Sequence, residues 1–187
     1  VAKEIDGKIL TLYNTQIHDG IKFLQEADTL IGHNIIGYDI PVLEKLYDVK
    51  FNCEVEDTLV MSRLFNPVRE NGHALKAWGW RVGMLKQEQP EDFDSYTPEM
   101  LEYCIQDVKL NEAVYKFLIK EGSIFSADSI NLEHDVARII KQQELNGFFF
   151  NTQQAMELLA DLKTKQLEVE DEVHNTFKPK LVDDKLV

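Results

Sequence analysis

The longest amphipathic pattern in the chain begins at Thr97-Pro98-Glu99, a typical helix start. Apolar residues then form a stripe that anchors the predicted helix against a core: Met100, Leu101, Ile105, Val108, Val114 and Leu118. Tyr103 and Asp107 are four positions apart, so a hydroxyl and a carboxylate project from one face of this helix. A half-buried Tyr beside a surface Asp gives the same pattern, so the pair alone does not establish a site.

The first residues of the chain predict a β-hairpin. Residues 1–5 and 8–13 read as strands on either side of Asp6-Gly7, a pair suited to a type I′ turn. Residues 19–27 then predict a short helix.

A strand, a loop and a helix start follow. Residues 29–33 predict a buried strand whose end carries Asn34, and Tyr38 and Asp39 come just before Pro41, which suits a first helical turn. Asp39 therefore lies where a strand end meets a helix N-terminus, the usual place for a site in an open α/β sheet. Asp is also a favoured N-cap, so both interpretations of Asp39 stay open.

Two further elements follow in the first half of the chain. Residues 51–56 predict a strand, and the helix after it runs to residue 64 with Asp57 expected as its cap rather than as a ligand. Residues 73–82 predict another helix. His73 either caps this helix or contacts DNA, and the cap is the favoured interpretation.

The pattern changes after residue 122. A helix is predicted over residues 126–145, a stop at Asn146-Gly147, and a last helix to residue 175. These features predict a first domain over residues 1–122 and a second, helical unit over residues 123–187.

The composition is that of a soluble globular protein, with 187 residues of which 44% are hydrophobic and 28% charged. No apolar run reaches membrane-spanning length, so no membrane partner is expected. Cys53 and Cys104 lack partners at the spacing of a disulfide framework or a zinc site. A reducing, cytoplasmic setting is the simplest interpretation.

The net charge of −13 excludes a broad basic coat for nucleic acid. It does not exclude a metal-dependent nuclease, because carboxylates that bind cations are neutralised in use. Much of the remaining acid lies in residues 88–102 and 168–172, where a solvated face is expected.

Four segments occur in one familiar order: residues 33–39, 57–64, 73–83 and 103–107. Together they resemble the proofreading 3′-5′ exonuclease domain of bacteriophage family A DNA polymerases, in the Tyr-bearing branch of the DEDD superfamily. Asn34, Tyr38 and Asp39 match its Asn-x-x-x-(Phe/Tyr)-Asp motif, and Tyr103 and Asp107 match its Tyr-x-x-x-Asp motif. Residues 126–177 resemble the segment that links this domain to the polymerase thumb.

The resemblance implies catalysis with two Mg²⁺ or Mn²⁺ ions on single-stranded 3′ DNA ends. Asp107 would hold the metal on the nucleophile side, with Tyr103 orienting the water, and Asp39 would serve the second metal. Asn34 would position the 3′ end, and the Tyr38 ring would pack beneath the loop. Tyr38 and His73 belong with Asn34 to the expected substrate-binding set, and the polymerase domain of the same parent chain is the expected partner.

The expected architecture is a ribonuclease H-like α/β domain. It has a mixed sheet with an antiparallel hairpin, helices on both faces, and a short helical segment after it. The family's first motif, Asp-x-Glu, does not occur in this sequence. We therefore expect the first central strand to be missing and the two-ion site to be incomplete. We also expect the chain to bind metal weakly and to cleave poorly or not at all.

Two other functions stay open. One is a non-catalytic module that uses the same fold to hold DNA or the polymerase body, which the missing motif favours. The other is a free-standing exoribonuclease of the same superfamily, against which the linker resemblance counts. Activity on DNA ends compared with RNA ends would separate the two enzymes.

Overall fold

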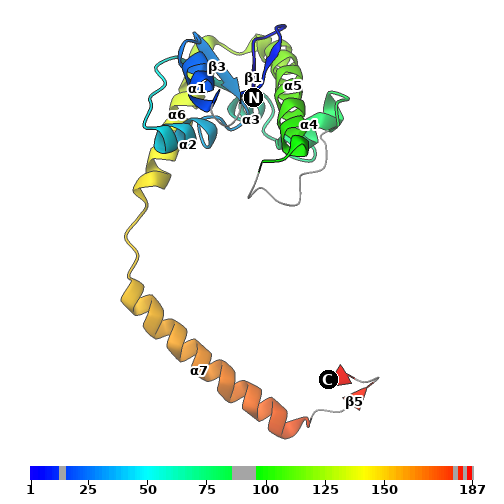
Figure 1. The fold of residues 1–187 in the computed structure, drawn as a ribbon. Coiled ribbons are helices and arrows are strands. Elements are labelled where there is room, and N and C mark those ends of the chain that lie inside the picture. The colour runs from blue at the N-terminus through cyan, green and yellow to red at the C-terminus, as the bar shows by residue number, and fades with distance from the viewer. Residues whose placement is uncertain (13–15, 86–95, 179–180, 183–184, 187) are drawn as a thin grey trace. The chain divides into compact units, whose positions relative to one another are not determined.

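A computed structural model describes residues 1–12, 16–85, 96–178, 181–182 and 185–186 (Figure 1). Contacts divide the chain into two compact units, Val1–Leu145 and Asn146–Val187. These units are defined by contacts and not by function, so the functional boundary expected after residue 122 stays a prediction.

The first unit alternates strands and helices, which confirms the predicted α/β class. Its elements are β1 (Ala2–Lys3), β2 (Ile9–Leu10), α1 (Ile17–Gln25), β3 (Thr29–Gly32), α2 (Asp39–Tyr47), β4 (Glu54–Asp57), α3 (Thr58–Phe65), α4 (Leu75–Arg81), α5 (Pro98–Glu121), a 3₁₀ turn (Gly122–Ile124) and α6 (Ala127–Asn146). The second unit contains α7 (Thr152–Thr176), β5 (Leu181–Val182) and β6 (Lys185–Leu186).

The described strands pair in twos. β1 and β2 are antiparallel, β3 and β4 are parallel with Leu30 opposite Val55, and β5 and β6 are antiparallel. The hairpin and the parallel pair expected in one mixed sheet are thus both present. Within the described residues, no strand hydrogen bonds to both of them.

The turn of the first hairpin differs from the prediction. Gly7 N–H donates to Glu4 O at 2.9 Å, and Asp6 has a φ of 57° whereas Gly7 does not have a positive φ. A type I′ turn needs positive φ at both central residues, so that prediction was wrong. Remote contacts hold Asp6 in place, since its N–H donates to Glu112 Oε1 at 2.8 Å and its carboxylate accepts from Lys116.

Helices cover both faces of the β3–β4 pair, as expected. On one face Leu30 and Val55 pack in a cluster that includes Leu24 of α1. On the other, Glu56 accepts a hydrogen bond from Tyr115 of α5; burial and this contact raise the pKa of the Tyr115 hydroxyl. Figure 1 shows α1 and α2 on one side of β3 and α5 on the other.

A second apolar cluster fixes α5. It consists of fully or almost fully buried side chains from α3, α4 and α5: Met61, Trp78, Leu110, Val114 and Leu118. The α5 members follow helical spacing, so one stripe of the helix is committed to the core. Thr97 caps α5 by accepting from Met100 N–H, and Pro98 lies in its first turn, both as predicted.

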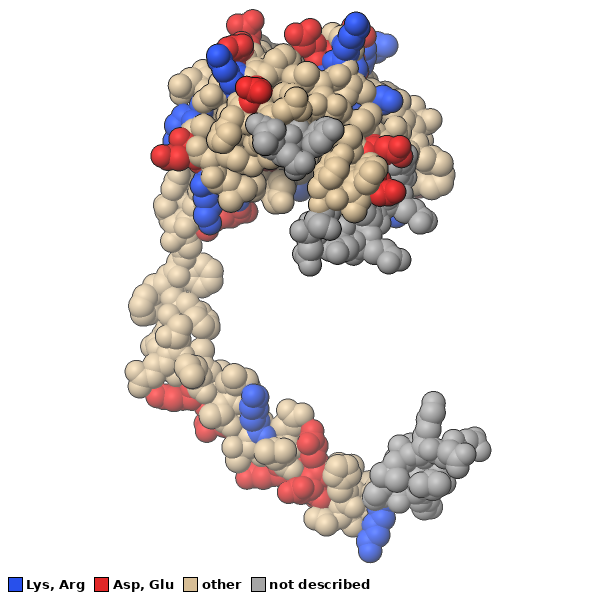
Figure 2. Space-filling model, viewed as in Figure 1, with Lys and Arg blue, Asp and Glu red and all other residues tan. Residues whose placement is uncertain are grey.

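The helix stop predicted at Asn146-Gly147 is present, since α6 ends at Asn146. Gly147 has a φ of 65°, and Asn151 caps α7 by accepting from Gln154 N–H. Residues 168–172 are exposed as expected, and Figure 2 shows acidic side chains gathered along α7. The acidic stretch that starts at residue 88 lies mostly outside the described residues. In the described part of the chain, no helix has both the length and the apolar character that crossing a bilayer requires.

Candidate active site

The loop that carries the first candidate group is clamped by a buried carboxylate. Asp57 is 1% exposed, and its two oxygens accept from the backbone N–H groups of Asn34 at 2.8 Å and Ile36 at 3.1 Å. It also accepts from Leu59 N–H at 2.9 Å, which makes it the N-cap of α3 as predicted. One side chain therefore joins the loop after β3 to the start of α3.

Asp57 is in turn held by a residue that sequence reasoning missed. The Asp57 N–H donates to Nε2 of His134 at 2.7 Å, and the other ring nitrogen lies 2.8 Å from Ile130 O. Because Nε2 accepts, the proton is on Nδ1, which donates to that carbonyl. His134 is 3% exposed and joins α6 to the end of β4. A lone His in an amphipathic helix gives no sequence signal for such a contact.

Asn34 takes an unusual backbone conformation directly after β3. Its φ is 64°, in the left-handed region that Asn tolerates better than most residues. A Cβ on Gly37 would lie 2.4 Å from Asn34 Oδ1, so this approach needs a glycine. The neighbouring Tyr38 is 64% exposed, so the expectation that its ring packs beneath the loop was wrong. Its role as a substrate contact stays a prediction.

Asp39 is the first residue of α2 and is exposed. Tyr38 occupies the N-cap position, so the interpretation of Asp39 as the cap was wrong. Loss of hydration against the surrounding protein raises the pKa of the Asp39 carboxyl, and the negative charge of Asp57 adds to this; a backbone hydrogen bond acts the other way. An exposed acid with a raised pKa suits a group that meets a cation or a proton, but a ligand role is not established by it.

The second candidate group lies on the face of α5 that meets the end of β3. Tyr103, Asp107 and Asn111 follow at intervals of four and share this face. Asn111 Oδ1 accepts from Thr58 Oγ1 at 2.8 Å, and Asn111 Nδ2 donates to Ile31 O at 3.5 Å. Tyr103 and Asp107 are half-buried. The helix face with the Tyr–Asp pair is thus fixed at the end of β3 from which Asn34 emerges, by an Asn that sequence reasoning did not single out.

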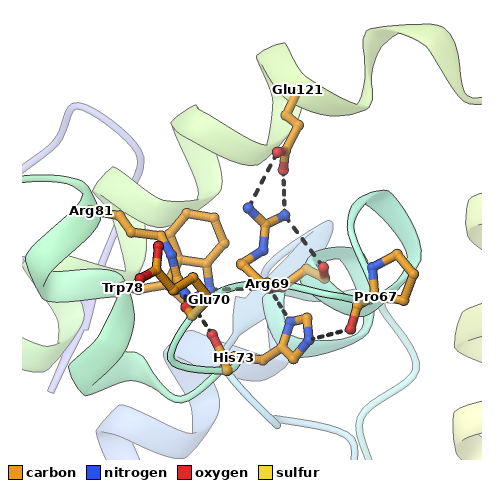
Figure 3. A network of polar contacts seen from close by, with 9 residues as sticks. Pro67, Arg69, Glu70, His73, Trp78, Arg81 and Glu121 are labelled. Atoms are coloured by element: carbon orange, nitrogen blue, oxygen red, sulfur yellow. Dashed lines mark hydrogen bonds and ion pairs between the residues drawn. The ribbon is translucent and has the colours of Figure 1, made fainter.

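His73 lies in a different network (Figure 3). Its Nδ1 is 2.8 Å from Ser62 Oγ and its Nε2 is 3.4 Å from Pro67 O. The N-cap of α4 is Ala74, so the cap interpretation of His73 was wrong. Its contact with DNA stays a prediction.

A cleft of about 230 Å³ lies beside the loop, lined by Asn34, Gly37, α3 and α6. Its cationic side chains are Arg63 and Lys141, the latter 3.5 Å from Glu144. Arg63 is exposed and has no ion pair among the described residues. A guanidinium and an ammonium at one cleft are the groups that bind phosphodiesters.

The fit of the site to two divalent cations is partial. Asp39 and Asp107 supply the oxygen ligands that Mg²⁺ and Mn²⁺ prefer. Among the residues that the structure describes, however, no group of three or more His, Cys, Asp or Glu side chains converges on one point. These residues do not by themselves form a complete two-ion site.

The chain is similar to bacteriophage DNA polymerases. It is 27% identical to the DNA-directed DNA polymerase of Escherichia phage T7 over 206 residues, which covers 79% of this chain and 29% of that protein. The DNA-directed DNA polymerase of Enterobacteria phage T3 is also 27% identical, over 82% of this chain and 30% of its own length. No protein-family profile matches the chain. The similarity supports a polymerase-related function and spans under a third of each relative.

Proposed function

We propose that residues 1–122 form a 3′-5′ exonuclease domain of the proofreading type. In this proposal residues 123–187 lead toward the thumb of a phage-type DNA polymerase, and the substrate is a single-stranded 3′ DNA end. A phage-encoded parent would act in the host cytoplasm.

The observation that carries the proposal is that one motif directly follows β3 and that the helix with the other motif contacts β3. Asn34 leaves β3 with its N–H bound to Asp57, and Asn111 ties the Tyr103–Asp107 face of α5 to Ile31 O. The first contact joins residues 23 positions apart in the chain, and the second joins residues 80 positions apart. The similarity to two phage DNA polymerases agrees with this assignment.

Each side chain then has a role that its chemistry allows. The Asp107 carboxylate accepts a hydrogen bond from the attacking water, and the Tyr103 hydroxyl orients that water from the same helix face. Asn34 holds the terminal nucleotide through its amide. Arg63 and Lys141 neutralise the phosphodiester that follows the 3′ end.

Divalent cations enter the proposal as weakly bound ions. Asp39 and Asp107 have the right donor atoms, but too few carboxylates converge in the described residues for tight binding. We therefore propose a dependence on millimolar Mn²⁺ or Mg²⁺.

The test is release of nucleotides from 3′-labelled single-stranded DNA by this chain in Mn²⁺. Asp107→Ala is expected to abolish release, whereas Asp135→Ala, which removes an exposed acid of α6, is the matched control. The same assay on 3′-labelled RNA separates a DNA exonuclease from an exoribonuclease. Release that survives Asp107→Ala would contradict the proposal.

A second candidate function is a non-catalytic module that binds DNA. The lack of a converging carboxylate cluster among the described residues favours it. It predicts that the chain binds single-stranded DNA without releasing nucleotides at any Mn²⁺ concentration, and that Asp107→Ala leaves the affinity unchanged.

A further inference from the structure

The two tryptophans of the chain lie two positions apart on α4 and have opposite environments. Trp78 is fully buried, and Trp80 is 70% exposed. Residues two apart on a helix point to opposite sides, so a fixed Trp78 forces Trp80 outward.

Trp78 is held by polar contacts on several sides as well as by apolar packing (Figure 3). The guanidinium of Arg69 lies 4.6 Å from its ring centroid and that of Arg81 lies 5.1 Å away. Arg69 forms a two-pronged ion pair with Glu121 of α5, with distances of 3.2 and 2.6 Å. The Trp78 ring N–H donates to Ser62 Oγ at 3.2 Å. Helix α4 is therefore held firmly at Trp78, which fixes the side of the helix from which Trp80 projects.

Trp80 borders an open groove of about 440 Å³ whose other lining residues are Asn71, Ala74, Lys76 and Ala77. The small side chains of Ala74 and Ala77 leave space beside the indole ring. Among the described residues that line the groove, Lys76 is the one with a charge, in a chain with a net charge of −13. The described part of the lining thus combines a flat aromatic face with a cation, and none of its side chains is a carboxylate.

We propose that this groove binds one unpaired base of a single-stranded nucleic acid. The base stacks on the Trp80 ring, and Lys76 pairs with the adjoining phosphodiester. Stacking on an exposed aromatic ring beside a cation is the usual way in which proteins hold single strands without reading their sequence. An indole that is 70% exposed gains free energy when its apolar surface is covered, and a base has a matching π-face.

The groove is linked to the candidate active site by packing. Helix α4 packs on α5, which carries Tyr103 and Asp107, and Gln106 Nε2 donates to Leu85 O at 3.5 Å just beyond α4. The identity of the strand as DNA rests on the proposed function. The base-binding groove itself does not depend on catalysis.

Tryptophan emission tests the proposal directly, because the chain has two tryptophans and one is exposed. Titration with oligo(dT) in the absence of metal is expected to quench the red-shifted emission of Trp80 in a saturable way. Trp80→Phe should remove that signal while it retains binding. A strand of abasic units of equal length carries the phosphates without the bases and should not quench.

Affinity, measured with a dye-labelled oligo(dT), gives the second readout. Trp80→Ala is expected to weaken binding about tenfold, because one stacked base is lost. Lys76→Gln should weaken binding about threefold. It should also reduce the slope of log affinity against log salt concentration by about 0.7, the value for one phosphate contact on a single strand. Phe148→Ala removes another exposed aromatic side chain, from the other unit, and should leave the affinity unchanged.

The outcomes separate this proposal from the proposed function. Unchanged affinity in Trp80→Ala, or equal quenching by the abasic strand, would contradict base binding in the groove. This holds whether or not the chain is a nuclease. Base-dependent quenching without nucleotide release would support base binding in the groove and count against the exonuclease. Trp80 emission that shifts with protein concentration alone would show that a second copy of the chain covers the ring, which also overturns it.

Discussion

The two candidate groups at the end of β3 are held in opposite ways. The Tyr103–Asp107 pair lies on a 24-residue helix with its own N-cap and a buried stripe. The Asn34–Asp39 loop has one residue with positive φ, and backbone N–H groups that are satisfied by Asp57, more than 20 residues away.

This difference indicates which substitutions should disturb each group. The helix repeats the same hydrogen bond at every residue, so one substitution on its surface removes little of its support. The loop packs Ile35 and Ile36 in the apolar cluster with Leu30, but its N–H groups depend on one carboxylate. The backbone of that residue, Asp57, is held in turn by His134. Substitutions far from the loop should therefore disturb Asn34 and leave Tyr103 in place, and the variants below test this from the largest expected effect to the smallest.

Asp57→Ala should have the largest effect. It leaves three backbone N–H groups without their charged acceptor in a buried place, and we expect a loss of about 3–5 kcal/mol of unfolding free energy. Urea unfolding followed by Trp78 emission measures this loss. Hydrogen exchange should show that the amides of Asn34 and Ile36 lose nearly all protection, whereas Leu110 stays protected up to the reduced free energy of global unfolding.

The control for Asp57→Ala is Asp135→Asn, an exposed acid paired with Arg138, which should change stability by less than about 0.5 kcal/mol. Equal loss of protection at the loop and at α5 would contradict the separation of the two regions.

His134→Ala should have the next largest effect, about 1–3 kcal/mol, because the buried Asp57 N–H loses its acceptor. His134→Gln places an amide oxygen near the position of Nε2 and should restore part of the loss. The measurement is again urea unfolding, together with exchange of the Asp57 amide. His174→Ala on exposed α7 is the matched control. No difference between the Ala and Gln variants would mean that packing, and not the hydrogen bond, holds α6 there.

Glu112→Gln tests the helix side of the comparison. Burial alone would raise the pKa of Glu112, but hydrogen bonds from Lys3, the Asp6 N–H and Lys116 outweigh it and lower the pKa to about 2. The stabilisation is therefore complete above the unfolded-state pKa, near 4.5, and is lost as the pH falls toward about 2.

The substitution should thus destabilise the chain at pH 6 and have little effect near pH 2, as measured by thermal unfolding across this range. The exposed Glu133→Gln should not show this trend. A Glu112→Gln difference that does not vary with pH would contradict the ion-pair account.

Asp39→Asn should have the smallest effect on stability, and in the opposite direction. Because the pKa of Asp39 is raised, the folded chain binds this proton more tightly than the unfolded chain does. Ionised Asp39 therefore lowers stability as the pH rises through its pKa. In unfolding experiments at pH 7, Asp39→Asn should therefore be slightly more stable than the parent chain. At pH 3 this difference should be smaller. Asp161→Asn on α7 should show no such gain, and a loss at pH 7 would show that Asp39 has a favourable partner.

The elements of the fold were largely predictable because their signals are local. Thr97-Pro98, Asp57 and Asn151 mark helix starts through hydrogen bonds to residues two or three positions ahead. The failures were positions where remote contacts decide the backbone. Contacts with Glu112 and Lys116 hold Asp6, and the turn there is not of type I′. The N-cap of α4 is Ala74 and not His73.

The sequence by itself determined which residues can form a site: it placed Tyr103 and Asp107 on one helix face and Asn34 at a strand end, since periodicity and caps act over a few residues. Tertiary structure alone decided how they are held. The contact of His134 with Asp57 spans 77 positions. Which of two nearby tryptophans is buried also depends on Arg69 and Glu121, because packing between distant segments leaves no local pattern.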